Sequence, residues 1–271
     1  MNEIKRFQVR GIPGSVTRAS FRGRVADFWS PKGGSQHLLI AHDGQNIFDP
    51  RSATFLRQTW KMAQTAIRVF KEFDLQPPVI VGIFHSSNKE DPHGRIKDLS
   101  PELAFRSGIA PSNPIAEISL EDLRGNKYLD QIWNEIVPTV ISSTNSQHQP
   151  NTTAMIGSSM GGLATLNAFS LFPDYFDTCL SFSPHWTLAG QPLVEYLIGN
   201  LPKPEKKKLW MSRGTKGLDS SYAPFQERAD QLARQLGWSH NFRTTVYHRT
   251  GHNERSWASY LDQALKFWIN K

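Results

Sequence analysis

A serine flanked by glycines at a fixed spacing is the strongest chemical signal in this chain. Gly157, Ser159 and Gly161 form the pattern G-x-S-x-G. Residues 152–156 before it read as a short strand, and residues 163–169 after it follow a helical apolar pattern. A serine on a sharp turn from strand to helix is held above the sheet, at a helix N-terminus that favours developing negative charge. We therefore expect Ser159 to act as a nucleophile.

A serine hydroxyl needs a general base at neutral pH, and that base needs a carboxylate to orient it. On an α/β-hydrolase sheet the acid and then the histidine follow the serine along the chain, in loops just past strand ends. Asp219 is the first acid after the strand expected at 208–211, whereas Glu227 falls inside the next helix. His252 lies in a turn between the last strand and the last helix. The sequence therefore predicts a triad of Ser159, Asp219 and His252.

Cleavage of an ester places negative charge on the carbonyl oxygen, and two backbone N–H groups normally bind it. One N–H belongs to the residue after the nucleophile, which is Met160 here. The second is expected in the loop 42–46, where Gly44 allows a tight backbone turn. We assign this second donor to Gln45.

Two aromatic side chains are candidates for contact with the substrate. His185 and Trp186 follow the strand expected at 178–182, so they should lie at the same sheet edge as Ser159. Trp186 either forms a wall for an apolar or aromatic group or packs beneath a loop, and the sequence favours neither role.

No motif for a metal or a cofactor accompanies these residues. Asp91 and His93 are close in sequence, but no third ligand has a suitable spacing. The chain contains no dinucleotide-binding glycine pattern after a strand and no phosphate-binding loop. We therefore expect chemistry that needs neither a cofactor nor a metal.

Apolar segments of strand length alternate with segments of helix length along the chain. Strands are expected at 5–10, 21–29, 37–41, 78–84, 152–156, 178–182, 208–211 and 242–248, and helices at 60–73, 128–141, directly after Ser159, at 222–236 and at 254–270. The first two strands are expected to form an antiparallel pair. The alternation predicts an α/β fold with a mostly parallel central sheet and helices on both faces.

One domain covering 1–271 is expected, because no linker, repeat or low-complexity block divides the chain. Residues 86–126 are polar and interrupted by prolines. We expect them to form a long excursion, lying either over the active site or on the surface away from it.

Composition limits the partners and the compartment. The net charge is +7, but the basic residues are scattered and no nucleic-acid-binding motif accompanies them. No apolar run has membrane-spanning length, and the first residues do not resemble a signal peptide. The only cysteine, Cys179, excludes an internal disulfide. We expect a soluble cytoplasmic protein with no nucleic-acid or membrane partner, and the oligomeric state stays undetermined.

Five motifs, in the same order along the chain, resemble those of one family of α/β hydrolases. Residues 42–49 read HDGQNIFD, which is similar to the family's HDGQNLFD, and residues 157–162 read GSSMGG. Residues 183–186, 214–219 and 251–257 are similar to its SPxW, GTxxLD and HNExxW segments. The chain thus resembles the "putative esterase" family, which includes enterochelin-esterase-like and esterase D-like enzymes.

The resemblance implies a carboxylic-ester hydrolase that acts on a small-molecule ester through Ser159, Asp219 and His252. Acyltransferases of the mycolyl and antigen-85 type share this fold, so acyl transfer, or cleavage of a lactone or peptide, is an alternative for the same triad. A binding protein without catalysis is a third alternative, but such proteins typically lose a triad member. Relatives often read RxxEYxP where this chain reads RIKDLSP at 95–101. No substrate preference is therefore carried over from them.

Overall fold

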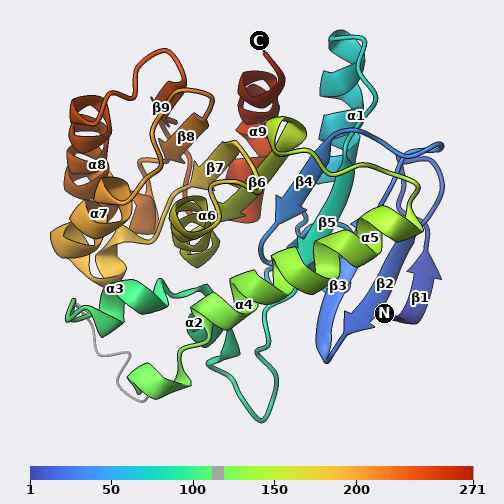
Figure 1. Ribbon diagram of the computed structural model, residues 1–271, viewed down its shortest axis with the longest axis horizontal. Helices are drawn as coiled ribbons and strands as arrows, with labels where there is room; N and C mark the ends of the chain where they lie inside the picture. Colours follow the sequence, from blue (N-terminus) through green and yellow to red (C-terminus); the bar gives the residue numbers. More distant parts are fainter. Residues whose placement is uncertain (112–118, 271) are drawn as a thin grey trace.

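The computed structural model describes residues 1–111 and 119–270. Within these residues a nine-stranded sheet runs in the order β1-β2-β3-β5-β4-β6-β7-β8-β9 (Figure 1). The strands are β1 (Asn2–Phe7), β2 (Val16–Phe21), β3 (Arg24–Trp29), β4 (Leu38–Ala41), β5 (Val79–Ile83), β6 (Thr153–Ser158), β7 (Thr178–Phe182), β8 (Lys208–Arg213) and β9 (Phe242–Val246). The ladders from β5 to β9 are all parallel, and those from β1 to β5 are antiparallel. The expected mostly parallel α/β fold is confirmed.

The antiparallel part of the sheet differs from the expectation. The expected strand at 21–29 begins only at Arg24, and sequence analysis missed the strand β2 before it, so β1 pairs with β2 and not with the segment 21–29. The chain reverses between β2 and β3 at Arg22 and Gly23, whose φ angles are 44° and 91°. Two successive positive φ angles are typical of the tight turn that closes a two-residue hairpin. Phe21 accordingly pairs with Arg24 across the turn, and β2 and β3 are separate strands.

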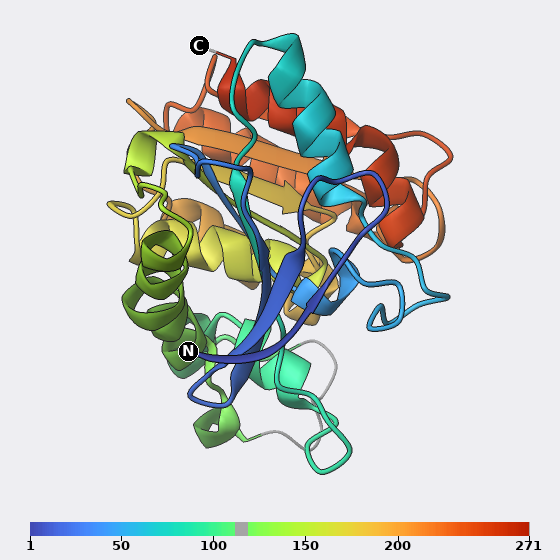
Figure 2. The ribbon, with the colours of Figure 1, turned by 90° about the vertical axis from the view of Figure 1, so that its right-hand side faces the viewer.

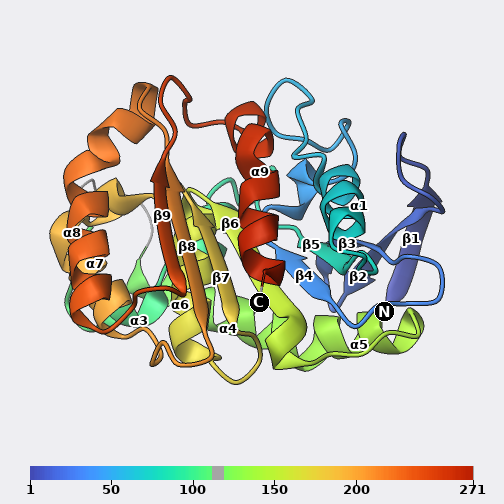
Figure 3. The ribbon, with the colours of Figure 1, turned by 90° about the horizontal axis from the view of Figure 1, so that it is seen from above.

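Helices cover both faces of the sheet, as expected. The α-helices are α1 (Met62–Glu72), α2 (Gly94–Leu99), α3 (Glu102–Arg106), α4 (Gly125–Gln131), α5 (Val137–Ser143), α6 (Met160–Leu171), α7 (Gly190–Gly199), α8 (Ala223–Gln235) and α9 (Glu254–Ile269). Short 3₁₀ segments are η1 (Gly44–Asn46), η2 (Leu120–Asp122), η4 (Pro150–Thr152), η5 (Trp186–Leu188) and η6 (Gly217–Tyr222). Helices α1 and α9 pack side by side on one face, and α4, α5 and α6 lie on the other (Figures 2 and 3).

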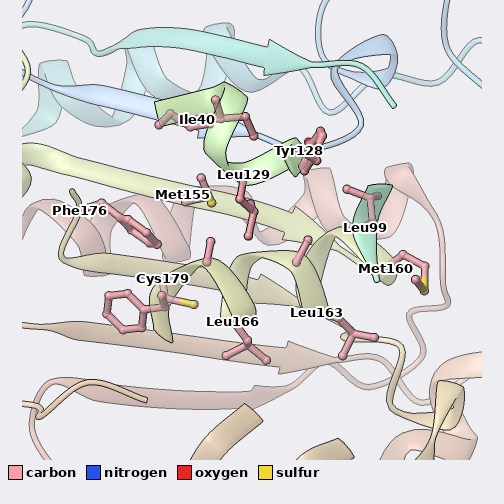
Figure 4. Close-up of a cluster of buried hydrophobic side chains, with 14 of the residues drawn as sticks. Ile40, Leu99, Tyr128, Leu129, Met155, Met160, Leu163, Leu166, Phe176 and Cys179 are labelled. Carbon is pink, nitrogen blue, oxygen red and sulfur yellow. The ribbon is translucent and has the colours of Figure 1, made fainter. Parts of the chain in front are cut away.

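Helix α6 holds the carboxyl end of β6 in place. Every residue of α6 from 160 to 169 is buried, which is typical of a helix that is apolar on all sides. Leu163 and Leu166 of this helix belong to the same core cluster as Met155 of β6 and Cys179 of β7 (Figure 4). Core packing of β6 before the turn and of α6 after it therefore fixes the turn that carries Ser159.

The helix expected at 128–141 is interrupted by one π-helical segment, η3 (Ile132–Ile136). Pro138 lies in the first turn of α5 and has no N–H to donate to the preceding turn. The widened turn between α4 and α5 accommodates this missing hydrogen bond.

The excursion at 86–126 carries short helices rather than only loop. Helices α2 and α3 and the segment η2 lie within it, and residues 112–118 lie outside the described part of the chain. Its helix α2 packs against α4 and α6. No helix of the described residues is both long and apolar enough to span a bilayer.

Candidate active site

Ser159 lies on the turn between β6 and α6, with φ 56° and ψ −122°. Such a conformation costs a residue other than glycine about 1–3 kcal/mol and is concentrated at functional sites. A Cβ atom on Gly157 would come within 2.3 Å of the Gly161 carbonyl oxygen, so the turn requires glycine there. The Ser159 amide donates to the Phe182 carbonyl (3.0 Å), and its own carbonyl accepts from the His185 amide (3.2 Å). The turn therefore has the geometry of a nucleophile elbow.

Asp219 and His252 are in direct contact. His252 Nδ1 and Asp219 Oδ1 share a hydrogen bond of 2.6 Å. Asp219 is completely buried, and its Oδ2 accepts hydrogen bonds from the Gly214 amide (2.7 Å) and the Ser183 hydroxyl (2.9 Å). Because fixed donors occupy both oxygens, the carboxylate has one orientation and holds the imidazole in one orientation as well. With Nδ1 donating to Asp219, Nε2 of His252 is the nitrogen that can accept a proton.

The loops that carry these two residues are joined by backbone hydrogen bonds. The amides of Thr215 and Lys216 both donate to the Thr250 carbonyl at 3.0 Å. The His252 ring lies edge-on against Trp257 and Tyr222, with centroid distances of 5.0 and 5.6 Å. The backbone bonds between the loops and the two aromatic rings therefore hold Asp219 and His252 in contact.

The loop after β4 packs against the elbow. A Cβ atom on Gly161 would lie only 3.1 Å from Cβ of His42. Gln45 lies in the first turn of η1, and Met160 is the first residue of α6. The N–H groups at a helix N-terminus have no intrahelical acceptor, which is the position of both predicted oxyanion donors.

Arg95 joins the excursion to this loop, and sequence analysis did not identify it as a site residue. It donates two hydrogen bonds of 2.7 Å to the two carboxylate oxygens of Asp43. Burial by itself would raise the pKa of Asp43, but the charge and hydrogen bonds of Arg95 outweigh burial and lower that pKa. Asp43 has a positive φ of 53°, and its side chain is nearly buried. The ion pair thus fixes the residue that directly precedes η1.

A second contact that sequence analysis missed ties the same loop to α9. Asn46 Nδ2 donates to Glu254 Oε1 at 3.0 Å, and both side chains are buried. Burial raises the pKa of Glu254. The Asn46 backbone carbonyl accepts from the Trp60 amide, and its side-chain oxygen accepts from the Thr54 amide. Asn46 therefore connects the two loops that carry Gln45 and His252.

His185 and Trp186 lie in different environments. His185 Nδ1 hydrogen-bonds the Tyr222 hydroxyl at 2.5 Å. Burial, and then the nearby His252 and Arg95, lower the pKa of His185 to about 4, so its ring is neutral at pH 7. Trp186 is completely buried, and its indole N–H donates to Gln226 Oε1 at 3.0 Å. Of the two roles considered for Trp186, the packing role agrees with this burial.

Within the described residues no hydrogen bond joins the Ser159 hydroxyl to His252. Such contacts are often long in free enzymes and shorten in the complex with substrate. The described residues also contain no group of three or more His, Cys, Asp or Glu placed to hold a metal ion. Asp91 instead accepts hydrogen bonds from Lys97 (3.0 Å) and Arg124 (2.9 Å).

Solved structures with this fold include an esterase and a hydrolase. The enterobactin esterase FES from Shigella flexneri has a TM-score of 0.64 at 17% identity, over 98% of this chain and 58% of that one. The enterobactin and salmochelin hydrolase IroE has a TM-score of 0.59 at 18% identity, over 94% of this chain and 95% of that one. The BES protein from Bacillus cereus has a TM-score of 0.63 at 14% identity, over 97% and 94% of the two chains.

Sequence comparison points to the same group. The uncharacterized protein YbbA of Bacillus subtilis is 30% identical over 128 residues, which are 42% of this chain and 50% of YbbA. The aligned part thus spans half the length of that relative. The model of the family described as "Putative esterase" matches residues 22–267. Because this match covers most of the chain, the protein belongs to the "Putative esterase" family.

Proposed function

We propose that this protein is a serine carboxylic-ester hydrolase that forms an acyl-enzyme on Ser159. Membership of the esterase family supports ester hydrolysis. The observation that carries the serine mechanism is the 2.6 Å hydrogen bond between Asp219 and His252, in a molecule whose Ser159 occupies a strained turn. An oriented imidazole and a serine on a strained turn are the parts that acyl transfer requires.

In the first half of the reaction, Ser159 Oγ attacks the ester carbonyl carbon while His252 Nε2 takes the hydroxyl proton. The oxygen of the tetrahedral intermediate becomes negative and binds the N–H groups of Gln45 and Met160. The intermediate then expels the alcohol, which leaves with the proton held by His252. In the second half, water attacks the acyl-enzyme with His252 again as base, and the carboxylic acid is released.

The substrate class proposed is a small-molecule carboxylic ester. FES has been solved in the presence of enterobactin, and IroE is described as an enterobactin and salmochelin hydrolase. Identities of 17–18% to these chains support a shared fold and do not carry their substrates over. Transfer of the acyl group to another alcohol uses the same intermediate, so assays with and without an added alcohol distinguish the two outcomes by their products.

The nucleophile is tested with a fluorophosphonate probe and an ester panel. We expect the probe to label Ser159, and Ser159→Ala to lose ester cleavage by on the order of 10⁴–10⁶-fold in kcat. Ser158→Ala is the matched control, because Ser158 is the last residue of β6 and lies before the turn. A Ser159→Ala variant that retains most of its activity would contradict the assignment.

A further inference from the structure

Three cationic side chains gather beside His252. Lys216, Arg249 and Arg255 line an open groove of about 620 Å³ that also borders His252. All three residues are exposed, and within the described residues none of them forms an ion pair. Among the residues that the structure describes, no Asp or Glu lines this groove. Elsewhere in the protein, by contrast, partly buried arginines such as Arg18 pair with carboxylates.

Backbone amides connect the two segments that carry Lys216 and Arg249, although the charges of these side chains repel. The Lys216 amide donates to the Thr250 carbonyl (3.0 Å), and the Arg249 amide donates to the Thr215 hydroxyl (2.9 Å). Arg249 has a positive φ of 63°, so its position depends on this turn. Like charges held near one another without counter-charges raise the local concentration of an anionic ligand.

Apolar side chains border the adjoining cavity. Phe55 and Leu56 are 63% and 88% exposed, and they line a space of about 330 Å³ together with His252 and Arg255. Large apolar side chains exposed beside one another often mark a binding surface. His252 and Arg255 border both spaces, so an apolar wall and a cationic groove meet at the base.

In the proposed mechanism the alcohol portion of the ester lies beside His252. Nδ1 of His252 is occupied by Asp219, so Nε2 protonates the departing alcohol oxygen. That oxygen must lie within hydrogen-bond distance of Nε2, and the group attached to it must then lie over the residues around His252.

We infer that the groove of Lys216, Arg249 and Arg255 binds the alcohol portion of the ester and selects alcohols that carry an anionic group on an apolar or aromatic body. The inference rests on the proposed function and adds the substrate class. The anionic group is a carboxylate, sulfonate or phosphate, whose oxygens pair with guanidinium and ammonium groups.

Esters of matched size test the inference on the complete protein. The three substrates are benzyl butyrate, 4-carboxybenzyl butyrate with the charge on the alcohol, and monobenzyl succinate with the charge on the acyl chain. At low ionic strength we expect kcat/KM for 4-carboxybenzyl butyrate to exceed that for benzyl butyrate by about tenfold, the combined effect of three exposed charge pairs. Monobenzyl succinate should show no such advantage. Raising the salt to roughly 0.15 M shortens the screening length from about 30 Å to about 8 Å and should reduce the preference.

Variants that each remove one cation test whether the preference for the anionic alcohol arises in the groove. Lys216→Gln, Arg255→Gln and Arg249→Asn should each lower the ratio of the two butyrate rates by about twofold, and asparagine tolerates the positive φ at Arg249. Lys206→Gln removes the same charge from an exposed site before the amino end of β8, whereas Lys216 follows its carboxyl end, and should leave the ratio unchanged. A ratio near one in the unaltered protein, or equal effects of Lys206→Gln and the groove variants, would overturn the inference. Cleavage of benzyl butyrate would still support the proposed ester hydrolase in that case. Failure to cleave any of the three esters would overturn both.

Discussion

Arg95 donates a hydrogen bond of 2.7 Å to each carboxylate oxygen of Asp43. The two residues are 52 positions apart, and they join helix α2 of the excursion to the loop that carries Gln45. Asp43 is only 6% exposed, so its charge has little access to water and depends on this partner. The excursion is thereby attached to the candidate active site by a specific ion pair.

Removal of Arg95 should therefore affect both stability and turnover. Arg95→Met leaves Asp43 buried without a counter-charge, and we expect the free energy of unfolding to fall by about 3 kcal/mol. We also expect kcat to fall, because the loop that carries Gln45 loses its anchor. Urea unfolding and ester kinetics measure the two effects. In the double variant Arg95→Met with Asp43→Asn the buried charge is gone, and much of the stability should return; an Arg95→Met protein as stable as the wild type would refute the argument.

The variant Asp219→Asn should keep the fold but change the tautomer of the general base, His252. An amide can present N–H to Nδ1 of His252, and the imidazole then takes the wrong tautomer. We expect kcat to decrease by on the order of 10³–10⁴-fold, with little change in thermal stability. Glu227→Gln, in helix α8, is the matched control and should remain active. If the losses were reversed between the two variants, the acid would have to be reassigned.

Trp186 should matter for stability more than for selectivity. Its side chain is completely buried, and Gln226 accepts its N–H, so Trp186→Ala leaves a cavity and an unpaired amide oxygen. We expect a loss of about 3–5 kcal/mol in the free energy of unfolding. Rates across acyl chains of different length should fall together, because the side chain does not reach the surface. A large change in chain-length preference without loss of stability would instead place Trp186 at the substrate.

His42 should make stability depend on pH. Burial lowers its pKa from 6.5 to about 4 in the folded protein. The unfolded state therefore binds more protons between these values, and the contribution of His42 to stability is present above pH 6.5 and lost as pH falls towards 4. We expect this loss to amount to about 2 kcal/mol between pH 7 and 4.5.

The measurement is the difference in unfolding free energy between the wild type and His42→Asn across this pH range. Asparagine can place its amide near the position of Nδ1, which hydrogen-bonds the Tyr128 hydroxyl at 2.7 Å. The difference isolates His42 from other groups such as Asp177, whose pKa burial raises to about 6 and whose contribution has the opposite sign. A difference that does not vary with pH would show that His42 has the same pKa in the folded and unfolded states, and would contradict the lowered pKa.

The sequence alone was enough to predict the strand, turn and helix around Ser159, because adjacent residues encode them. Gly157 is required by the turn itself, and the apolar run of α6 follows directly. The loops of Asp219 and His252 were also predictable, since parallel strands deliver their following loops to one sheet edge. The strand β2 (Val16–Phe21) was missed, although the Arg22–Gly23 turn after it is also a local signal.

Only the tertiary structure shows which distant side chains meet at the site. Asn46 and Glu254 are 208 residues apart, and Arg95 reaches Asp43 from an excursion with no regular pattern in its sequence. Trp186 is adjacent in sequence to His185, yet its side chain is buried in the core and its indole N–H donates to Gln226. Backbone patterns depend on neighbours along the chain, whereas these contacts depend on how the packed sheet and helices bring separate loops together. Burial and pairing of single side chains were therefore decided by the fold and not by their local sequence.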